Sequence, residues 1–306
     1  MSTTARASLR LPAVRASWVR PILLANLVGE VLIVITGGIV RLTGSGLGCP
    51  TWPECVPGSF VPVPHQEQGI HKFIEFGNRT LTGMVGILAI LAIWAVVTHW
   101  PKRSRMHWVA YGVLGGVAAQ ALVGGVTVRT GLNPFTVAFH FLMSMALVAL
   151  STTLVRGAQD EESGPGELLV HPLARTLAWG TATVGGVVLV LGTIVTGSGP
   201  HSGDAATPAR TGFDPRMVAW LHADTVMFFC GLVIATLVAV RLTTRDGRTR
   251  RAWNVVLLVT LLQGLVGYVQ YFTALPETLV LAHMVGATAL VIALTYGVLA
   301  LRRNPV

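Results

Sequence analysis

Leu281-Ala282-His283-Met284-Val285 sets one histidine inside an apolar run, and three other stretches of the chain repeat this arrangement. These are Gly69-Ile70-His71-Lys72-Phe73-Ile74-Glu75, Val137-Ala138-Phe139-His140-Phe141 and Ala219-Trp220-Leu221-His222-Ala223. An imidazole in an apolar run is expensive inside a membrane and usually marks a functional site. Four histidines that recur in alternate apolar segments therefore suggest an interior that binds a ligand.

The composition is that of an integral membrane protein. The chain has 306 residues, of which 52% are hydrophobic and 11% are charged, whereas a soluble domain carries about 25% charged residues. Several apolar stretches reach the roughly 20 residues that a helix needs to cross a bilayer. The net charge of +9 comes from basic residues between these stretches. We therefore read the charge as a signal for membrane topology and expect the lipid bilayer, not nucleic acid, as the partner.

The apolar pattern predicts eight transmembrane helices, over residues 18–42, 71–99, 107–128, 134–155, 172–196, 216–240, 252–272 and 276–301. Basic residues gather at the N-terminus, in the turns near 102–105 and 241–251, and at Arg302 and Arg303. The positive-inside rule then places both termini in the cytoplasm. All four histidines lie toward the outer face in this topology.

The chain contains an internal duplication. Thr43-Gly44-Ser45-Gly46 ends the first predicted helix, Thr196-Gly197-Ser198-Gly199 ends the fifth, and a long loop follows each. The fold class is therefore an all-α membrane protein of two pseudo-symmetric four-helix bundles. We expect a flexible N-terminus (1–16), an N-terminal bundle (17–156), an acidic Gly/Pro-containing linker (157–171) and a C-terminal bundle (172–303).

The histidines favour axial ligation of haem. Two imidazoles on opposed helices can hold a haem inside a bundle, and we assign this to His222 and His283. The alternative is that each histidine only bonds a neighbouring helix. In the first half, Asn78 matches the position of His222, while His71 lies two turns, about 10 Å, further out. His140 is the opposite partner in that half.

Further polar residues accompany the first-half histidines. Glu75 is predicted to transfer a proton or polarise a substrate, or else to form an ion pair with Arg79 four residues later. Three arginines near outer helix ends are candidates for haem propionates or for interfacial snorkelling: Arg41, Arg79 and Arg129. Glu30 lies deeper, where Gln120 or Gln263 could pair with it, and its role stays open. Cys49 and Cys55 share one loop, which fits a disulfide in an oxidising compartment.

Three segments together resemble the haem A synthase family: residues 37–46, Cys49-Pro50-x-Trp52-Pro53-x-Cys55, and Ile74-Glu75-Phe76-Gly77-Asn78-Arg79, with histidines 140, 222 and 283. The resemblance implies that the C-terminal half holds haem b through His222 and His283. It implies that the N-terminal half oxidises the C8 methyl of haem O to a formyl group by successive hydroxylation, with Glu75 essential. The product would serve cytochrome c oxidase, so haem O synthase and oxidase assembly factors are expected partners.

One position departs from the resembled pattern. The family motif Glu-x-x-His-Arg has Asn78 in place of its histidine. Either His71 replaces that ligand, or His140 alone ligates the substrate haem; we favour His140. A multi-pass protein of the bacterial inner membrane is expected, because no transit peptide is evident. The alternative function is a bis-histidine b-type cytochrome that exchanges electrons with quinone, and a transporter with internal repeats explains the histidines less well.

Overall fold

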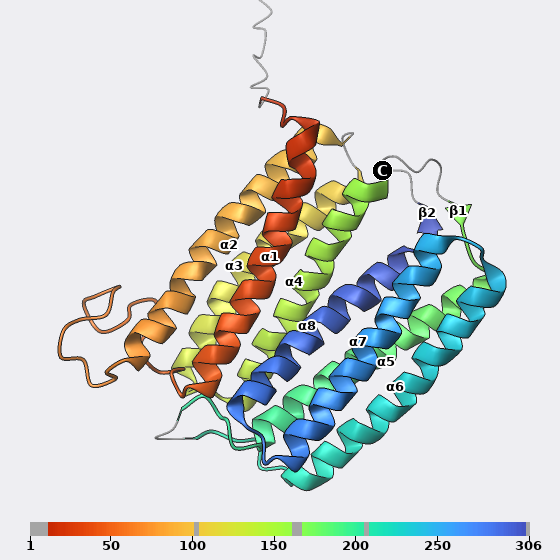
Figure 1. Ribbon diagram of the computed structural model, residues 1–306. Helices are drawn as coiled ribbons and strands as arrows, with labels where there is room; N and C mark the ends of the chain where they lie inside the picture. The colour runs from red at the N-terminus through yellow and green to blue at the C-terminus, as the bar shows by residue number, and fades with distance from the viewer. Residues whose placement is uncertain (1–11, 101–103, 161–166, 205–207, 304–306) are drawn as a thin grey trace, which may run out of the picture.

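The computed structural model describes residues 12–100, 104–160, 167–204 and 208–303, and within them the chain is almost entirely helical (Figure 1). The helices are α1 (Ala16–Leu42), α2 (His71–His99), α3 (Arg105–Arg129), α4 (Pro134–Asp160), α5 (Pro172–Ser198), α6 (Pro215–Thr243), α7 (Gly247–Phe272) and α8 (Glu277–Leu299). Two short strands, β1 (Glu167–Leu168) and β2 (Arg302–Arg303), pair antiparallel. All eight helices are long and apolar enough to cross a membrane, which confirms the predicted number of spans.

Some helix ends differ from the predicted ones because caps, not apolar residues, set them. α7 begins at Gly247, five residues before the predicted start, because the carboxylate of Asp246 accepts a hydrogen bond from the Thr249 N–H (2.8 Å). Asp214 caps α6 in the same way, by accepting from the Met217 N–H (2.7 Å). An aspartate at this position satisfies an N–H that the helix itself leaves unpaired.

The predicted linker 157–171 is shorter in the structure, because α4 continues to Asp160. Residues 161–166 of that linker lie outside the described residues. So do residues 1–11 of the predicted N-terminal segment and two residues of a predicted basic turn, Lys102 and Arg103.

Helices α1 to α4 pack around one another, and so do α5 to α8. In the first set, α2 and α4 both pack against α1 and α3; in the second, α6 and α8 both pack against α5 and α7. The helices α2 and α4, and likewise α6 and α8, therefore lie at opposite corners. The sets meet where α4 packs against α5 and α8 and where α1 packs against α8. Each set has its own apolar core, and a third apolar cluster joins them.

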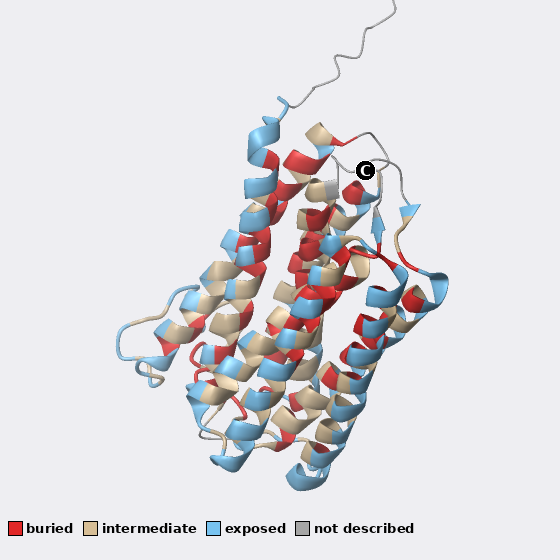
Figure 2. Cartoon of the chain, turned by 45° about the vertical axis from the view of Figure 1, so that its right-hand side comes forward, coloured by how far each residue is buried: buried red, intermediate tan, exposed pale blue. Residues whose placement is uncertain are grey.

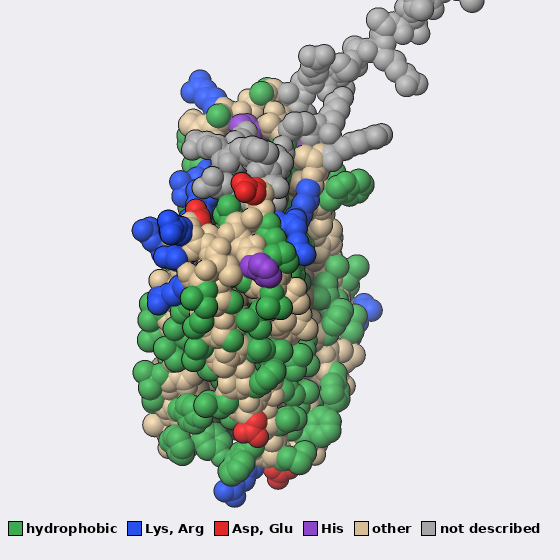
Figure 3. Space-filling model, turned by 90° about the vertical axis from the view of Figure 1, so that its right-hand side faces the viewer, with side chains coloured by type: hydrophobic (Ala, Val, Ile, Leu, Met, Phe, Trp, Pro, Cys, Tyr) green, Lys and Arg blue, Asp and Glu red, His purple; other side chains and the backbone are tan. Residues whose placement is uncertain are grey.

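The molecule is packed unevenly along its length. Figure 2 shows the buried residues concentrated in the half nearer the start of α1, whereas the other half has mainly intermediate and exposed residues. α1 begins and β2 ends at the same end of the molecule (Figure 1). On the face drawn in Figure 3, Lys and Arg side chains gather toward that end, above a broad hydrophobic belt. The loops that follow α1 and α5 lie at the opposite end.

The duplication extends to the backbone of the short turns after α3 and α7. Gly131 and Leu132 adopt left-handed φ values of 60° and 56°, and Ala274 and Leu275 adopt 62° and 59°. In each turn the leucine N–H donates to the carbonyl five residues earlier, at 2.9 and 2.8 Å. Non-glycine residues seldom adopt this conformation, yet both turns use it at matched positions. Because the two turns share this backbone conformation, they connect α3 to α4 and α7 to α8 with the same geometry.

Candidate functional site

A cavity of about 720 Å³ lies in the less tightly packed half, and every one of the eight helices contributes to its lining. Small-molecule sites commonly enclose about 300–1,000 Å³. Three of the four predicted histidines line this cavity, namely His140, His222 and His283. The described lining residues from α2 are Asn78, Thr82 and Val85. The cavity thus brings together most of the predicted ligands.

Each of these three histidines faces a glycine on the preceding helix. A Cβ built on that glycine would lie 3.4, 3.3 or 3.2 Å from the histidine Cε1, which is tighter than an ordinary carbon contact. The pairs are Gly124 with His140, Gly192 with His222, and Gly267 with His283. Glycine at these positions makes room for an imidazole ring that stands inside the bundle.

The rings also carry unused hydrogen-bonding capacity. Among the described residues, the buried Nδ1 atoms of His140 and His283 have no hydrogen-bond partner, whereas the His222 ring interacts with the backbone of Val188 on α5. A buried polar atom without a partner is costly and calls for an explanation such as a bound group. No three His, Cys, Asp or Glu side chains in the described part of the chain cluster closely enough to hold a bare metal ion. Single imidazoles from opposite helices suit a metal that brings its own equatorial ligands, as haem does.

Two glutamines secure the helix turns that carry two of the histidines. The Gln120 side chain donates from Nε2 to the carbonyl oxygen of His140 (3.0 Å), and Gln263 donates to that of His283 (2.7 Å). Both glutamines line the cavity. The sequence interpretation considered them only as partners for Glu30 and so missed this function, although both precede their histidine by the same number of residues.

Glu30 itself reaches the cavity from α1. Its side chain is 2% exposed, and its Oε1 atom has no hydrogen-bond partner among the described residues. The expected partner amides of Gln120 and Gln263 are instead directed to the histidine carbonyls. Glu30 is therefore a buried carboxylate that faces the cavity.

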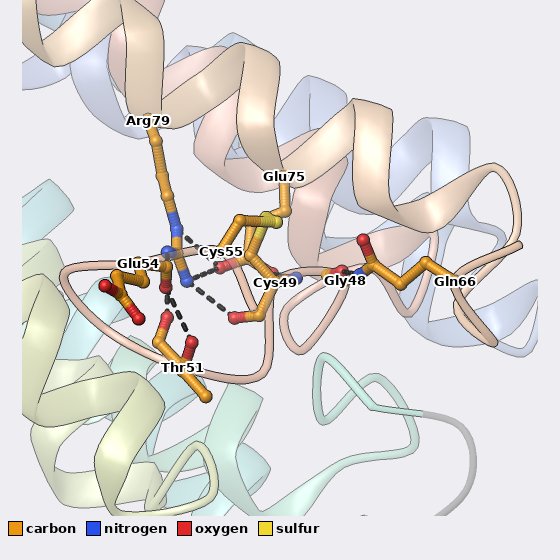
Figure 4. A network of polar contacts seen from close by, with 8 residues as sticks. All are labelled: Gly48, Cys49, Thr51, Glu54, Cys55, Gln66, Glu75 and Arg79. Atoms are coloured by element: carbon orange, nitrogen blue, oxygen red, sulfur yellow. Dashed lines mark hydrogen bonds and ion pairs between the residues drawn. A yellow bond between two sulfur atoms is a disulfide. The ribbon is translucent and has the colours of Figure 1, made fainter. Parts of the chain in front are cut away.

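Glu75 and Arg79 anchor the loop after α1 to the start of α2 (Figure 4). The Glu75 carboxylate accepts the Cys49 N–H at Oε2 (2.6 Å) and the Arg79 guanidinium at Oε1 (2.5 Å from Nη2). Arg79 also donates to the carbonyls of Cys49 (2.6 Å) and Thr51 (2.9 Å). The ion pair that the sequence offered as one alternative is formed. Glu75 lies one turn outward from Asn78, the outermost described α2 residue that lines the cavity.

Cys49 and Cys55 form a disulfide (2.00 Å), as predicted, and neither side chain is exposed. Arg129 holds the same loop from α3, by donating to the Trp52 carbonyl (3.0 Å) with its guanidinium over the Trp52 ring. Gly125, also on α3, leaves the space that this ring occupies. The loop is thus fixed to both α2 and α3.

Of the two remaining predicted residues, Arg41 lies at the cavity and His71 lies outside it. Arg41 lines the cavity and donates to the carbonyls of Thr196 (3.1 Å) and His201 (2.9 Å), which links α1 to the end of α5. His71 is exposed at the first residue of α2, and its Nδ1 is hydrogen bonded to the Ser45 hydroxyl (2.8 Å).

The cavity lining also includes an arginine that sequence inspection missed. Arg216 is exposed in the first turn of α6 and lines the cavity. It precedes His222 on the same helix by less than two turns. This spacing is the signal that could have identified it.

The fold and the cavity define a polytopic membrane protein with an interior cavity that is lined by imidazole side chains from opposed helices. The chain belongs to the COX15-CtaA family, described as "Cytochrome oxidase assembly protein", whose family model matches residues 20–295.

Several relatives carry the same name. The chain is 26% identical over 292 residues to a protein of Bacillus mycoides (strain KBAB4) named "Heme A synthase", a match that covers 90% of this chain and 91% of the relative. A Geobacillus kaustophilus (strain HTA426) protein of that name is 28% identical over 273 residues, covering 85% and 84%. One from Lysinibacillus sphaericus (strain C3-41) is 38% identical over 140 residues, 43% of each chain.

Proposed function

We propose that this protein is a haem A synthase, which oxidises the C8 methyl of haem O to a formyl group by successive hydroxylation for the biogenesis of cytochrome c oxidase. The observation that carries the proposal is the cavity lined by His140, His222 and His283 in a chain of this family. The name of the relatives points to the same activity. Haem O is the substrate in this proposal and haem b is the resident cofactor.

The haem b ligands in the proposal are His222 and His283. They project from opposite corners of the α5–α8 set, each beside a glycine that gives the ring space. The Cε1–Nδ1 edge of each ring lies against its glycine, which leaves the Nε2 side of the imidazole for the cavity and supports this assignment. Haem b, when bound, supplies one-electron redox chemistry. Gln263 fixes the turn that carries His283.

The substrate site in the proposal is the first-half part of the cavity, with His140 as the iron ligand and Arg41 as a partner for propionates. Both residues line the cavity. Arg79 and Arg129 are occupied with the Cys49–Cys55 loop, so we propose that they shape the outer wall of the site. His71 lies apart from the cavity lining, which favours His140 as the ligand.

Glu75 is the proposed proton-transfer residue. Conversion of a methyl group to a formyl group adds one oxygen atom and releases protons and electrons, and the electrons pass to an acceptor outside this chain. A base near the reacting carbon can take up the protons. Both Glu75 oxygens are hydrogen bonded, one to Cys49 and the other to Arg79. Transfer through Glu75 therefore requires that the loop or Arg79 releases one oxygen, which would couple the chemistry to movement of the Cys49–Cys55 loop.

We further propose two pseudo-symmetric bundles, a catalytic one over 17–156 and a haem b bundle over 172–303, with both termini in the cytoplasm of a bacterial inner-membrane protein. The helix contacts and the matched turns support the symmetry, and the basic side chains near the terminal end of the molecule support the orientation. Haem O synthase and oxidase assembly factors are the proposed protein partners.

The test is to purify the protein from cells supplied with haem O and to identify the extracted haems by chromatography. Haem b together with haem O or haem A supports the enzyme. Haem b alone supports the alternative function, a b-type cytochrome that only transfers electrons. Glu75→Ala should abolish haem A while the haem b spectrum stays unchanged. Glu277→Ala, a substitution of an exposed carboxylate in the first turn of α8, is the matched control and should leave haem A formation intact.

A further inference from the structure

We propose that Asn78 leaves the substrate haem iron with His140 as its one protein ligand, and that the Asn78 amide presents an N–H donor to the open side of the iron. This inference rests on the proposed function. The iron in the first-half site would then have an open position for a small molecule, which the iron between His222 and His283 would lack.

Asn78 occupies the position on α2 that His222 occupies on α6. Asn78 precedes the last residue of α2 by as many residues as His222 precedes the last residue of α6. Both side chains line the cavity, and α2 and α6 lie opposite α4 and α8, the helices of His140 and His283. Asn78 therefore stands where a second imidazole would complete the first-half pair.

A contact with α1 orients the Asn78 side-chain amide. The Thr36 hydroxyl on α1 has three acceptors within reach, the carbonyls of Leu32 (3.0 Å) and Ile33 (3.2 Å) and Asn78 Oδ1 (2.7 Å), and the contact with Asn78 is the shortest of the three. The amide oxygen is thus directed toward α1, and the NH₂ group is the end left for the cavity. An amide nitrogen donates two hydrogen bonds and is not an acceptor. Asn78 can therefore donate to a small molecule on the iron but cannot bind the iron through this nitrogen.

Other side chains on α1 and α2 are poorly placed to take the ligand position. His71 is exposed, two turns further out, with its Nδ1 bonded to Ser45. The oxygens of Glu75 are bonded to Cys49 and Arg79.

Glu30 lies at a different depth. Its neighbour Gly29 faces Val85 and Leu88 of α2, roughly 10–15 Å inward from Asn78 by helix rise. The iron opposite His140 is therefore left with the amide of Asn78 beside it.

The experiment compares carbon monoxide binding and resonance Raman spectra of the reduced full-length protein, purified with haem b and haem O both bound. We expect a five-coordinate, high-spin haem O that binds carbon monoxide, beside a six-coordinate haem b that does not. Asn78→His should convert haem O to a six-coordinate, low-spin form and abolish carbon monoxide binding. Asn78→Leu should retain binding but shift the C–O stretching frequency, because the N–H donor is lost.

Thr36→Val tests the orientation of the amide. Without the hydroxyl, the amide is free to rotate, and the C–O stretching band should broaden or shift toward that of Asn78→Leu. A six-coordinate, low-spin haem O in the unmodified protein would overturn the inference, as would an unchanged C–O frequency in Asn78→Leu. A protein that retains haem b alone after loading with haem O would overturn the proposed function, and this inference with it.

Discussion

Substitution of Gly192 by alanine tests whether the glycine opposite His222 makes room for a ligand ring. The added Cβ would lie 3.3 Å from His222 Cε1, whereas the favourable carbon–carbon separation is about 3.5–4.0 Å. The ring must therefore retreat by about 0.2–0.7 Å, which reaches or exceeds the roughly 0.2 Å tolerance of a metal–ligand bond. Overpacking of this kind costs about 1–3 kcal/mol, so haem b should be held roughly 5- to 150-fold more weakly.

The effect on folding should have the opposite sign. Without haem, the His222 side chain is free to move away from the added Cβ, and alanine is more favourable than glycine inside a helix by about 1 kcal/mol. Haem-free Gly192→Ala should therefore unfold at the same or a higher temperature than the haem-free parent. Gly186→Ala is the matched control, because Gly186 lies on the same helix, faces outward, and has nothing within 4 Å of the added Cβ. It should gain the same helix stability and leave the haem b spectrum unchanged.

The assay is titration of haem b into the detergent-solubilised, haem-free protein, followed by its absorbance spectrum, with thermal unfolding recorded in parallel. Gly192→Ala should show weakened binding and a shift toward a five-coordinate spectrum. Binding equal to that of Gly186→Ala would refute the reasoning, because the ring of His222 would then not be a ligand positioned by this contact. Weaker binding with a lower unfolding temperature of the haem-free form would indicate general disruption instead.

Three other changes should have distinct effects. Gln263→Leu removes a membrane-buried hydrogen bond, worth about 0.6 kcal/mol on average and at most about 1.7, and should shift the haem b spectrum with a slight loss of thermal stability, while Gln120→Leu should leave that spectrum unchanged. Replacing both Cys49 and Cys55 by serine should make residues 43–70 more sensitive to protease and reduce haem A formation, with haem b unaffected; equal protease sensitivity would contradict a stabilising effect of the disulfide on the conformation of the loop. Glu30→Gln replaces a buried carboxyl group, whose Oε1 has no partner among the described residues, with a neutral amide of similar size, so thermal stability should stay the same or rise; a fall in extracted haem A in the same variant would show that the carboxyl group participates in turnover.

Local sequence signals were sufficient to predict the eight helices and to identify three of the four histidines as residues of one interior site. The apolar runs identify eight spans because a helix in lipid must satisfy its backbone internally and present apolar side chains outward, and both requirements are visible in one segment at a time. His140, His222 and His283 share the cavity because each stands at a similar depth on an alternate helix. The capped start of α7 was missed, since Asp246 lies before the apolar pattern begins.

The contacts of the outer loop could not be predicted in the same way. Whether Glu75 faces a substrate or Arg79 depends on where the loop after α1 folds back, and that is decided by non-local bonds to Cys49 and Thr51. The same applies to Arg129, whose partner Trp52 is distant in sequence. Residue type and spacing identified these positions as important but did not distinguish a ligand-binding arginine from one that secures a loop.

The two halves of the molecule share most of the residues around their histidines. The hairpins α3–α4 and α7–α8 agree in their turns, in the glutamine bond to the histidine carbonyl and in the glycine that faces the ring. The differences therefore concentrate on α2 against α6. Counted from the helix ends, Asn78 is equivalent to His222, and the positions of Glu75 and Arg79 are taken in α6 by Ala219 and Ala223, which have no polar side chain. The α3–α4 and α7–α8 hairpins contribute the same features to both sites. The proposed open position on the iron and the attachment of the loop to Glu75 and Arg79 therefore arise from α2 and the loop that packs on it.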